Sequence, residues 1–556
     1  MDLIIEKYAL ENAVRYKGKA NPGAVIGSCI KENDSLKSDM KTLGKKVSEI
    51  VKKVNALSFE EQKAKLESLA PELLEKKKGE KKGLFDSFKV EGSVVTAFPP
   101  EPSKYMHIGH AKALFINYCF AKKFNGKFIL RFEDTNPELA KKEFYDILLK
   151  DVKWLGVKPD SVQYASDHML DFYRFCDKLI NLGKAYICTC PQEKIREGRM
   201  SGKPCDCRYN HIRENLIAWK NMPDYKEGEA IVRLKIDLKH KNSTMRDPTI
   251  FRIIKKPHCR VGKKYIVWPN YDFENAVMDG LQGVTHRFRS KEFEMRNELQ
   301  RYIQRLLSLP ETSILEFARF NLKGVESSGR KIRELINNNE LTGWDDPSLT
   351  TLIALKRRGF LPEAIKNFVL STGITKSEST LTWDDFIMHN KRLLDSDCNR
   401  YFFIKDPVRV RIHDAPSKVV KLKLHPEDVK KGFRTFKTNE LFYLSKDDFS
   451  MIQDKKIYRL MDCINFVKKK DYFVYLDDKL ETYKNSGDMI VHWLPFEMKK
   501  LVEVDVLMPD NKVVCGLAEP LVWNLKNGSI VQFERFGFCR LDKKNKTKLY
   551  FRFTHK

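Results

Sequence analysis

The chain has 556 residues, enough for three or four domains, and 42% of them are hydrophobic, enough for ordinary cores. Its formal net charge is +27 at pH 7, with basic residues spread along the whole chain. This charge favours a polyanion partner with a long footprint, such as a folded RNA. No stretch approaches the roughly 18 apolar residues of a membrane-spanning helix, and the N-terminus lacks a signal-peptide pattern, so we predict no membrane partner.

The cysteines indicate the compartment. Of the twelve, four fall between Cys188 and Cys207, and the other eight are scattered along the chain. Scattered cysteines are typical of a reducing environment and not of a disulfide framework. We therefore expect a cytoplasmic protein, which we also expect to be a monomer.

Residues 1 to about 75 have the hydrophobic spacing of helices. Apolar residues recur at helical intervals, and Asn21-Pro22-Gly23 separates two of the predicted helices: the spaced residues are Ile4, Ile5, Tyr8 and Ala9, then Val47, Ile50, Val51 and Val54. The charged segment Glu75–Gly83 then indicates a linker and a domain boundary.

From about residue 90, predicted strands alternate with predicted helices. A strand at Val94–Phe98 precedes a helix that follows His110, and a strand at Phe128–Phe132 precedes another helix. This alternation predicts an α/β domain with a parallel, doubly wound sheet, in which ligands bind at the carboxyl ends of the strands. Both His107 and Glu133 fall at such ends.

The segment between the first strand and its helix carries two imidazoles, His107 and His110, on the first helical turn. A helix N-terminus presents free backbone N–H groups and a partial positive charge, which suits phosphate. Gly109 leaves room for a flat ring against the backbone. A His-x-x-His pair alone is more often a surface pair, but here the strand, the Pro-rich turn and the helix supply the context of a phosphate site.

Glu133, at the end of the second strand, has two readings of similar weight. Its carboxylate is suited to bind an ammonium group, or it is a favourable acidic charge at a helix start beside Pro137.

Four cysteines offer a metal site. Cys188 and Cys190 are followed, after fourteen residues, by Cys205 and Cys207. A tetrahedral Zn²⁺ ion accepts four thiolates, although Cys-x-x-Cys is the usual spacing. The alternative is a group of reduced, partly buried cysteines.

After roughly residue 395 the pattern changes to short strands. Alternation with period two is found in Val408–Ile412, Val420–Leu424 and Leu501–Val506, and Val531–Phe538 is expected to be a further strand. Many short strands with turns between them predict antiparallel β-barrels.

Several of these segments resemble one family. The stretch Phe98–Ala113 is similar to the HIGH signature of class I aminoacyl-tRNA synthetases, in the form of their glutamyl and glutaminyl branch, and Arg131–Pro137 is similar to a further segment of that branch. Gly18–Gly27 resembles part of the helical domain appended to archaeal/eukaryotic-type glutamyl enzymes, and Gln532–Phe538 resembles their anticodon-binding barrels. The resemblance covers nearly the whole chain and implies a Rossmann-like catalytic domain.

The resemblance also implies an ATP site, with Mg²⁺ accompanying the nucleotide. Ser327–Arg333 resembles the mobile KMSKS loop, in which Lys331 matches the second lysine and stabilises charge on the phosphates. A basic surface turn is the plainer reading of this segment. The residues implied to bind ATP are Glu101, Pro102, Ser103, His107, Gly109, His110 and Lys331, of which His107, His110 and Lys331 are the catalytic ones.

For the amino acid, the resemblance implies a pocket formed by Glu133, Tyr271, Asn275 and Arg289. Glutamyl enzymes carry Arg at the position of Arg289, and a guanidinium pairs with a side-chain carboxylate in a bidentate way, which favours L-glutamate over glutamine. The neighbouring Arg287 would take this role if the match slipped by two residues.

Three positions, in two segments, depart from the family pattern. Ala97 stands where family members usually carry an Arg that contacts the substrate carboxylate. In the second signature, Ser328 replaces the first lysine and Arg330 replaces a small hydroxyl residue. These departures keep a catalytically weakened tRNA-binding paralogue as an alternative, beside a glutaminyl-tRNA synthetase.

We therefore predict a glutamate–tRNA ligase that uses ATP to charge the tRNA for glutamate, with the tRNA for glutamine as a second candidate. The predicted domains are a helical domain and linker at 1–83, a catalytic domain at 84–330 with an acceptor-stem insertion near 190–265, a helical connection at 331–395, and a β-barrel anticodon-binding region at 396–556. The four cysteines are implied to bind a structural Zn²⁺ in the insertion.

Overall fold

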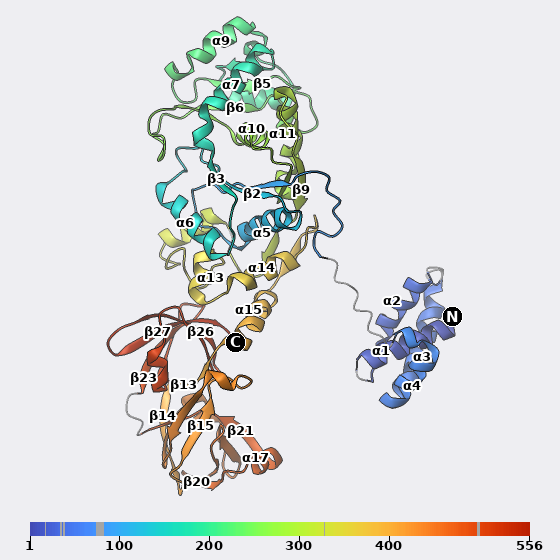
Figure 1. The fold of residues 1–556 in the computed structure, drawn as a ribbon, viewed down its shortest axis with the longest axis vertical. Coiled ribbons are helices and arrows are strands. Elements are labelled where there is room, and N and C mark those ends of the chain that lie inside the picture. The colour runs from blue at the N-terminus through green and yellow to red at the C-terminus, as the bar shows by residue number, and fades with distance from the viewer. Residues whose placement is uncertain (17, 34–35, 37–38, 74–82, 327, 497–500) are drawn as a thin grey trace. The chain divides into compact units, whose positions relative to one another are not determined.

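The computed structural model describes the chain except residues 17, 34–35, 37–38, 74–82, 327 and 497–500. Ser327 and the predicted linker, apart from Gly83, lie outside the described residues. The chain divides into two compact units, Met1–Phe88 and Lys89–Lys556 (Figure 1).

The first unit is helical, as predicted. Its helices are α1 (Asp2–Arg15), α2 (Pro22–Glu32), α3 (Met40–Asn55) and α4 (Phe59–Leu69). The Asn21 side chain accepts hydrogen bonds from the first backbone N–H groups of α2, and Pro22 takes the first helical position, so this sequence starts a helix. Residues at helical spacing, including Ile5 and Val47, form the core.

A five-stranded sheet lies at the centre of the second unit. The strand order is β3 (Ser161–Tyr164), β2 (Lys127–Phe132), β1 (Val95–Phe98), β8 (His286–Ser290) and β9 (Ser313–Phe317), and all neighbouring strands are parallel. The chain continues from β1 to β2 on one side, whereas β8 lies on the other side. The carboxyl ends of β1 and β8 are therefore the topological switch point where such sheets bind ligands.

Helices cover both faces of this sheet (Figure 1). They are α5 (Ile108–Lys123), α6 (Lys142–Trp154), α10 (Tyr271–Leu281) and α11 (Glu294–Leu307). The helix α7 (Met169–Asn181) lies farther from the sheet, in a core with α10 and α11. Asn117 of α5 is fully buried, and its amide exchanges hydrogen bonds with both backbone polar groups of Phe288 in β8, at 2.8 and 3.0 Å. The Asn117 side chain thus fixes α5 against β8, the strand that carries Arg287 and Arg289.

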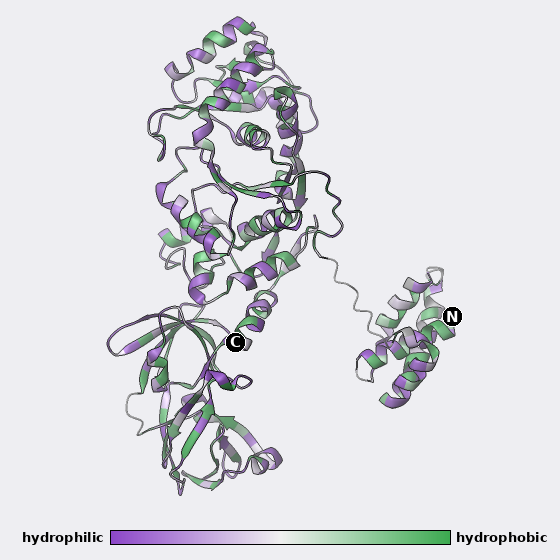
Figure 2. Ribbon diagram, viewed as in Figure 1, coloured by the Kyte–Doolittle hydropathy of each residue, from purple (hydrophilic) through white to green (hydrophobic). Residues whose placement is uncertain are grey.

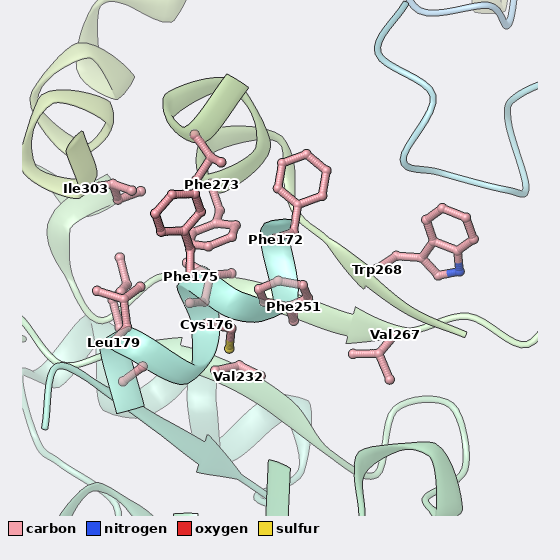
Figure 3. Close-up of a cluster of buried hydrophobic side chains, with 14 of the residues drawn as sticks. Phe172, Phe175, Cys176, Leu179, Val232, Phe251, Val267, Trp268, Phe273 and Ile303 are labelled. Carbon is pink, nitrogen blue, oxygen red and sulfur yellow. The ribbon is translucent and has the colours of Figure 1, made fainter. Parts of the chain in front are cut away.

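A separate antiparallel sheet forms the insertion, in the order β4 (Ala185–Cys188), β5 (Ile231–Leu234), β6 (Thr249–Ile253) and β7 (Val267–Pro269). The helices α8 (Gln192–Ser201) and α9 (Ile212–Lys220) lie between β4 and β5. Aromatic side chains such as Phe172, Phe251 and Phe273 join this sheet to α7 and α10 in one apolar core (Figure 3).

A helical connection follows the central sheet. It contains β10 (Phe320–Leu322), α12 (Gly329–Asn337), α13 (Leu352–Arg358), α14 (Pro362–Ser371), β11 (Ser379–Leu381) and α15 (Trp383–Asp397). Apolar residues of α13 to α15, such as Leu355 and Phe368, share a core with Leu114 of α5. The connection is therefore built onto the helix that follows the first strand.

The remaining chain forms two seven-stranded sheets and a hairpin. The first sheet contains β12 (Arg400–Tyr401), β13 (Phe403–Lys405), β23 (Val502–Leu507), β24 (Val513–Ala518), β25 (Ile530–Phe533), β26 (Gly537–Lys544) and β27 (Lys548–His555). The second contains β14 (Pro407–His413), β17 (Leu441–Ser445), β18 (Ile457–Leu460), β19 (Asn465–Lys469), β20 (Tyr472–Asp477), β21 (Gly487–Val491) and β22 (Leu494–Pro495). The hairpin pairs β15 (Val419–Lys423) with β16 (Phe433–Lys437), and two short helices are α16 (Lys446–Met451) and α17 (Leu480–Ser486).

Most of these strand pairs are antiparallel, as predicted, and Figure 2 shows hydrophobic and hydrophilic residues interspersed along the strands. The prediction of one strand over 531–538 was wrong. The segment is the end of β25, a turn, and the start of β26, because Arg535 adopts a left-handed conformation with φ of 59°. The aromatic alternation there belongs to two strands that pair with each other.

No helix in the described ranges is long and apolar enough to cross a membrane.

We expect Asn117→Leu to destabilise the second unit. The substitution removes two buried hydrogen bonds between the Asn117 amide and the backbone of β8, which costs about 2–4 kcal/mol of unfolding free energy. Urea unfolding measures this difference. Asn181→Leu is the matched control, because Asn181 is exposed and bonds only within its own helix, and a similar loss in both variants would contradict the assignment.

Candidate active site at the carboxyl ends of the parallel strands

A cavity of about 1030 Å³ opens at the carboxyl ends of β1, β2 and β8. Of the residues predicted to bind ATP or the amino acid, it is lined by Glu101, His107, Gly109, His110, Glu133, Tyr271 and Arg289. Pro102, Ser103, Asn275 and Lys331 do not line it. Residues that follow β1 and β2 and residues near β8, more than 130 positions later in the chain, thus line one cavity.

The two imidazoles form the start of α5, with ring centroids 4.0 Å apart. His107 is the N-cap residue, and its Nδ1 accepts a hydrogen bond from the backbone N–H of Gly109 at 3.0 Å. The Nδ1 atom of His110 accepts one from the backbone N–H of His107 at 3.2 Å. Since both Nδ1 atoms are acceptors, the neutral rings carry their protons on Nε2.

Burial lowers the pKa of His107 to about 4, and the positive charges of Lys104 and Arg319 add to this effect. Burial also lowers the pKa of His110 well below its ordinary value, again with His107 and Lys104 contributing. At neutral pH the pair therefore offers two uncharged N–H donors. Positive charge that balances a bound anion must come from other groups.

Gly109 is required by the neighbouring ring. A Cβ atom at this position would lie 2.8 Å from Cε1 of His107, closer than van der Waals contact allows. The absence of a side chain at Gly109 therefore makes room for the His107 imidazole. Gly109 also lines the cavity, where the sequence predicted that it faces a flat ligand ring.

The loop before α5 is fixed by its own polar groups. Ser103 Oγ donates to Glu101 Oε2 at 2.6 Å, and the carbonyl of the buried Pro102 accepts from the backbone N–H of Lys141 at 3.0 Å. The carbonyl of Pro100 accepts from the backbone N–H of Glu133 at 3.1 Å. The loop is thereby held to the end of β2, and Glu101 is its cavity-lining carboxylate.

Beneath the cavity lies a buried charged cluster that sequence reasoning missed in part. Arg131 bonds Asp279 at 2.9 Å and Asn275 at 3.1 Å, and Arg287 bonds the same two residues. Glu274 accepts from the amide of Asn275 at 2.8 Å. A charged residue within the apolar strand of β2 was the available sequence signal for Arg131, whereas its partners are about 150 residues away.

Glu133 lies at the edge of this cluster with an unused acceptor. Its Oε1 is 4.0 Å from a terminal nitrogen of Arg131 and is buried without a hydrogen-bond donor among the described residues. Burial raises the pKa of Glu133 to about 7, against the opposing effect of Arg131 and Arg287. Burial also raises the pKa of Glu274 well above its ordinary value. Two guanidinium groups thus face three carboxyl groups, those of Glu133, Glu274 and Asp279, and an added cation favours the ionised form of Glu133.

Tyr271 begins α10 beside the same wall. Its ring packs on that of Phe293, with centroids 5.6 Å apart, and the Arg296 guanidinium lies over it at 5.5 Å. Burial raises the pKa of the Tyr271 hydroxyl, so it stays protonated at neutral pH.

Arg289 differs from Arg287 in its partners. Its terminal nitrogens donate to Gln300 Oε1 at 3.0 Å and to Asn297 Oδ1, both neutral groups, and its Nε has no acceptor. No carboxylate of the described residues lies within ion-pairing distance of Arg289, whereas Arg287 pairs with Asp279. Arg289 is therefore a buried positive charge that faces the cavity without a counter-ion.

The two departures noted in the sequence have structural counterparts. Ala97 is fully buried in a small apolar cluster with Ile129 and Val284 and does not line the cavity. Lys331 lies in the first turn of α12, where its side chain is 64% exposed and pairs with Glu326 at 2.9 Å. Ser328 and Gly329, at the start of that helix, do line the cavity.

The four cysteines predicted to bind zinc converge in the insertion. Their sulfur atoms all lie within 4.8 Å of one another, with 3.8 Å between Cys188 and Cys205 and between Cys190 and Cys207. Tetrahedral Zn–S bonds of about 2.3 Å place sulfurs about 3.8 Å apart. The donor set and its spacing fit Zn²⁺ and leave no open coordination position.

Comparison with known proteins gives the family. Residues 93–396 match the model of the class I tRNA synthetases (E and Q), catalytic domain, and residues 398–474 and 469–542 match two models of the anti-codon binding domain of these synthetases. The glutamate–tRNA ligase of Pyrococcus furiosus is 40% identical over 99% of both chains. Those of Methanosphaera stadtmanae and Methanocaldococcus jannaschii are 37% and 39% identical over 99% and 97% of both chains.

The parallel sheet, the imidazole pair at its switch point and these matches define a class I aminoacyl-tRNA synthetase. Within this class the chain belongs to the family of the glutamate and glutamine (E and Q) enzymes, which confirms the family predicted from the first signature.

We expect both imidazoles to remain neutral, with the proton on Nε2, from pH 8 to pH 5.5. Because the pKa of His107 is about 4 in the folded chain and 6.5 ordinarily, the unfolded chain binds more protons between these values, so stability falls as the pH drops through this window. Nitrogen-15 NMR of histidine-labelled protein reports the tautomers directly. Titration of both rings with midpoints near 6.5 is the result that contradicts the geometry.

Proposed function

We propose that this chain is a glutamate–tRNA ligase. ATP and L-glutamate react to give glutamyl-adenylate and pyrophosphate, and the glutamyl group is then transferred to the terminal adenosine of tRNA. The observation that carries the proposal is Arg289, a buried guanidinium that faces the cavity and has only neutral partners among the described residues. Such a group attracts the side-chain carboxylate of glutamate and offers less to the neutral amide of glutamine.

The phosphate groups of ATP, bound with Mg²⁺, are placed at the start of α5. The Nε2–H groups of His107 and His110 and the N-terminus of α5 donate hydrogen bonds to phosphate oxygens. Gly109 and the loop at Glu101 face the nucleotide, while Pro102 and Ser103 hold that loop in place. The catalytic contribution is positioning and charge stabilisation, since no protein group changes its covalent bonds.

The glutamate is placed between Glu133 and Arg289. Its α-ammonium group favours the ionised form of Glu133 and donates a hydrogen bond to the free acceptor of that carboxylate. Tyr271 lines the same pocket, and Asn275 acts indirectly by orienting Arg131 and Arg287. The amino group and the side chain of the substrate are thus recognised by opposite charges on opposite sides.

Lys331 is placed on the pyrophosphate after a movement of the segment around α12. Its ion pair with Glu326 is exposed, and such pairs contribute only about 0–1 kcal/mol, so the lysine is readily released. The movement brings the ammonium group of Lys331 to the phosphates, because the first residues of α12 already line the cavity.

The RNA is bound at both ends of the second unit. The insertion near 190–265 contacts the acceptor end, and residues 396–556, which contain the two matched anti-codon binding regions, contact the anticodon. The domain boundaries at 83, 330 and 395 stay predictions, and the one at 330 falls within α12. All twelve cysteines are free, in keeping with a cytoplasmic, monomeric enzyme in a reducing compartment.

The four cysteine thiolates are proposed to bind a structural Zn²⁺. The ion would join the end of β4 to the short helical turn that begins at Asp206, across the seventeen residues that contain α8. Bound there, the metal supplies folding energy and a fixed loop geometry for the acceptor end of the tRNA.

ATP–pyrophosphate exchange tests the reaction. We expect glutamate-dependent exchange in the presence of tRNA, and a change of Arg289→Cys lowers kcat/KM for glutamate by about 10- to 100-fold through the lost charged contact. Exchange is measured with and without tRNA and with glutamine as the competing amino acid.

Arg301→Cys is the control, because Arg301 is an exposed residue of α11 that does not line the active-site cavity. An unchanged preference between glutamate and glutamine in Arg289→Cys would refute the assignment of that residue. Absence of exchange in the wild type, together with retained tRNA binding, supports the non-catalytic paralogue instead.

Metal analysis by plasma mass spectrometry tests the zinc site. We expect about one zinc per chain, its loss in Cys205→Ser, and weaker binding of tRNA by that variant because the insertion loses its cross-link. Cys259→Ser is the matched control, since Cys259 is exposed and lies outside the cluster. Full zinc content in Cys205→Ser, or none in wild-type protein grown with zinc, favours four reduced cysteines.

A further inference from the structure

The cavity lies beside two helix N-termini. One is that of α5, with His107 and His110, and the other is that of α12, whose N-cap residue Ser328 and first residue Gly329 line the same cavity. Lys104, from the loop before α5, also lines it. A Cβ atom at Gly329 would lie 3.6 Å from Cδ of Lys104, so this side chain reaches from the first helix start to the second.

Lys104 differs from the other cations near the imidazoles in having no counter-ion. Lys104 and Arg319 are the positive charges that act on both His107 and His110. Arg319 forms an ion pair with Glu292, whereas no carboxylate of the described residues pairs with Lys104.

Two further lysines are occupied elsewhere. Lys112 of α5 is 3% exposed and donates to the carbonyl of Ala318 at 3.1 Å, and Lys331 is paired with Glu326 outside the cavity. The imidazoles are neutral, so they give hydrogen bonds but no charge to a triphosphate. Lys112 also lacks a carboxylate partner, but its ammonium group is buried and held by the Ala318 carbonyl. Lys104 is thus the lysine at this end of the cavity with neither an ion pair nor a side-chain hydrogen bond among the described residues.

We propose that Lys104 is a catalytic residue whose ammonium group binds the β- and γ-phosphates of ATP and stabilises the departing pyrophosphate. In the reaction, a carboxylate oxygen of glutamate attacks the α-phosphorus, and the bond from this phosphorus to the bridging oxygen breaks. The electron pair stays on the pyrophosphate, where Lys104 stabilises the added charge without giving up a proton. The inference rests on the ATP site proposed above.

The test compares ligands with and without the β- and γ-phosphates. In Lys104→Met, which keeps the length of the side chain but not its charge, we expect the dissociation constant of ATP to rise about 10- to 100-fold. Affinity for glutamyl-sulfamoyl-adenosine, an adenylate analogue without these phosphates, stays within about twofold. Lys104→Arg restores most of the ATP affinity and of the exchange rate, and Lys142→Met, at an exposed lysine, changes neither.

Three outcomes overturn the proposal: equal losses of ATP and analogue affinity in Lys104→Met, no loss of either, or no rescue by arginine. These are distinct from failure of the proposed function, in which the wild-type chain itself shows no glutamate-dependent exchange.

Discussion

Two backbone hydrogen bonds fix the start of α5, and the geometry of the phosphate site depends on them. The N–H of Ile108 donates to the carbonyl of Thr350 at 3.1 Å, and the N–H of Leu352 donates to the carbonyl of Met106 at 2.8 Å. His107 and Thr351 thus lie side by side as in an antiparallel ladder. A helix start is the place where backbone donors lack internal partners, so an outside segment that holds it determines where those donors and the two imidazoles point.

Charge is distributed unevenly over the two ends of the cavity. At the proposed amino-acid end, Arg131 and Arg287 pair with the buried Asp279, whereas Arg289 has only neutral partners among the described residues. At the phosphate end the imidazoles stay neutral because burial opposes their protonation. Under the proposed function, this arrangement separates recognition of an acidic side chain from binding of a triphosphate, although both ligands are anions.

Local sequence was sufficient for the elements that begin or end at strong signals. The start of α5, the strands β1 and β2, and the helices around Asn21 were predicted because their capping and spacing lie within a few residues. The cluster of Arg131 with Asp279 was not, because its members are 148 residues apart and meet through the parallel sheet. The turn at Arg535 was missed because aromatic alternation continues through it, and nothing in that pattern marks a left-handed residue.

The segment around Thr350, which bonds to the start of α5, is also connected to the β-rich part of the second unit. Arg357 of α13 bonds Asp542 of β26 at 2.8 and 3.0 Å and pairs with Asp345, while Arg358 donates to the carbonyl of Thr554 in β27 at 2.8 Å. Arg358 also donates to the carbonyl of Pro347, three residues before Thr350.

A continuous set of hydrogen bonds therefore runs from β26 and β27, through residues 345–352, to the backbone beside His107. The region matched to anti-codon binding domains and the phosphate site are joined by packed and hydrogen-bonded groups and not by a free linker. Displacement of the 345–352 segment is one route by which binding of RNA at one end can alter the proposed phosphate site, because that segment contacts both ends. The apolar core that α13 to α15 share with α5 is a second route, because Asn390 of α15 and Phe360 also contact His555 of β27.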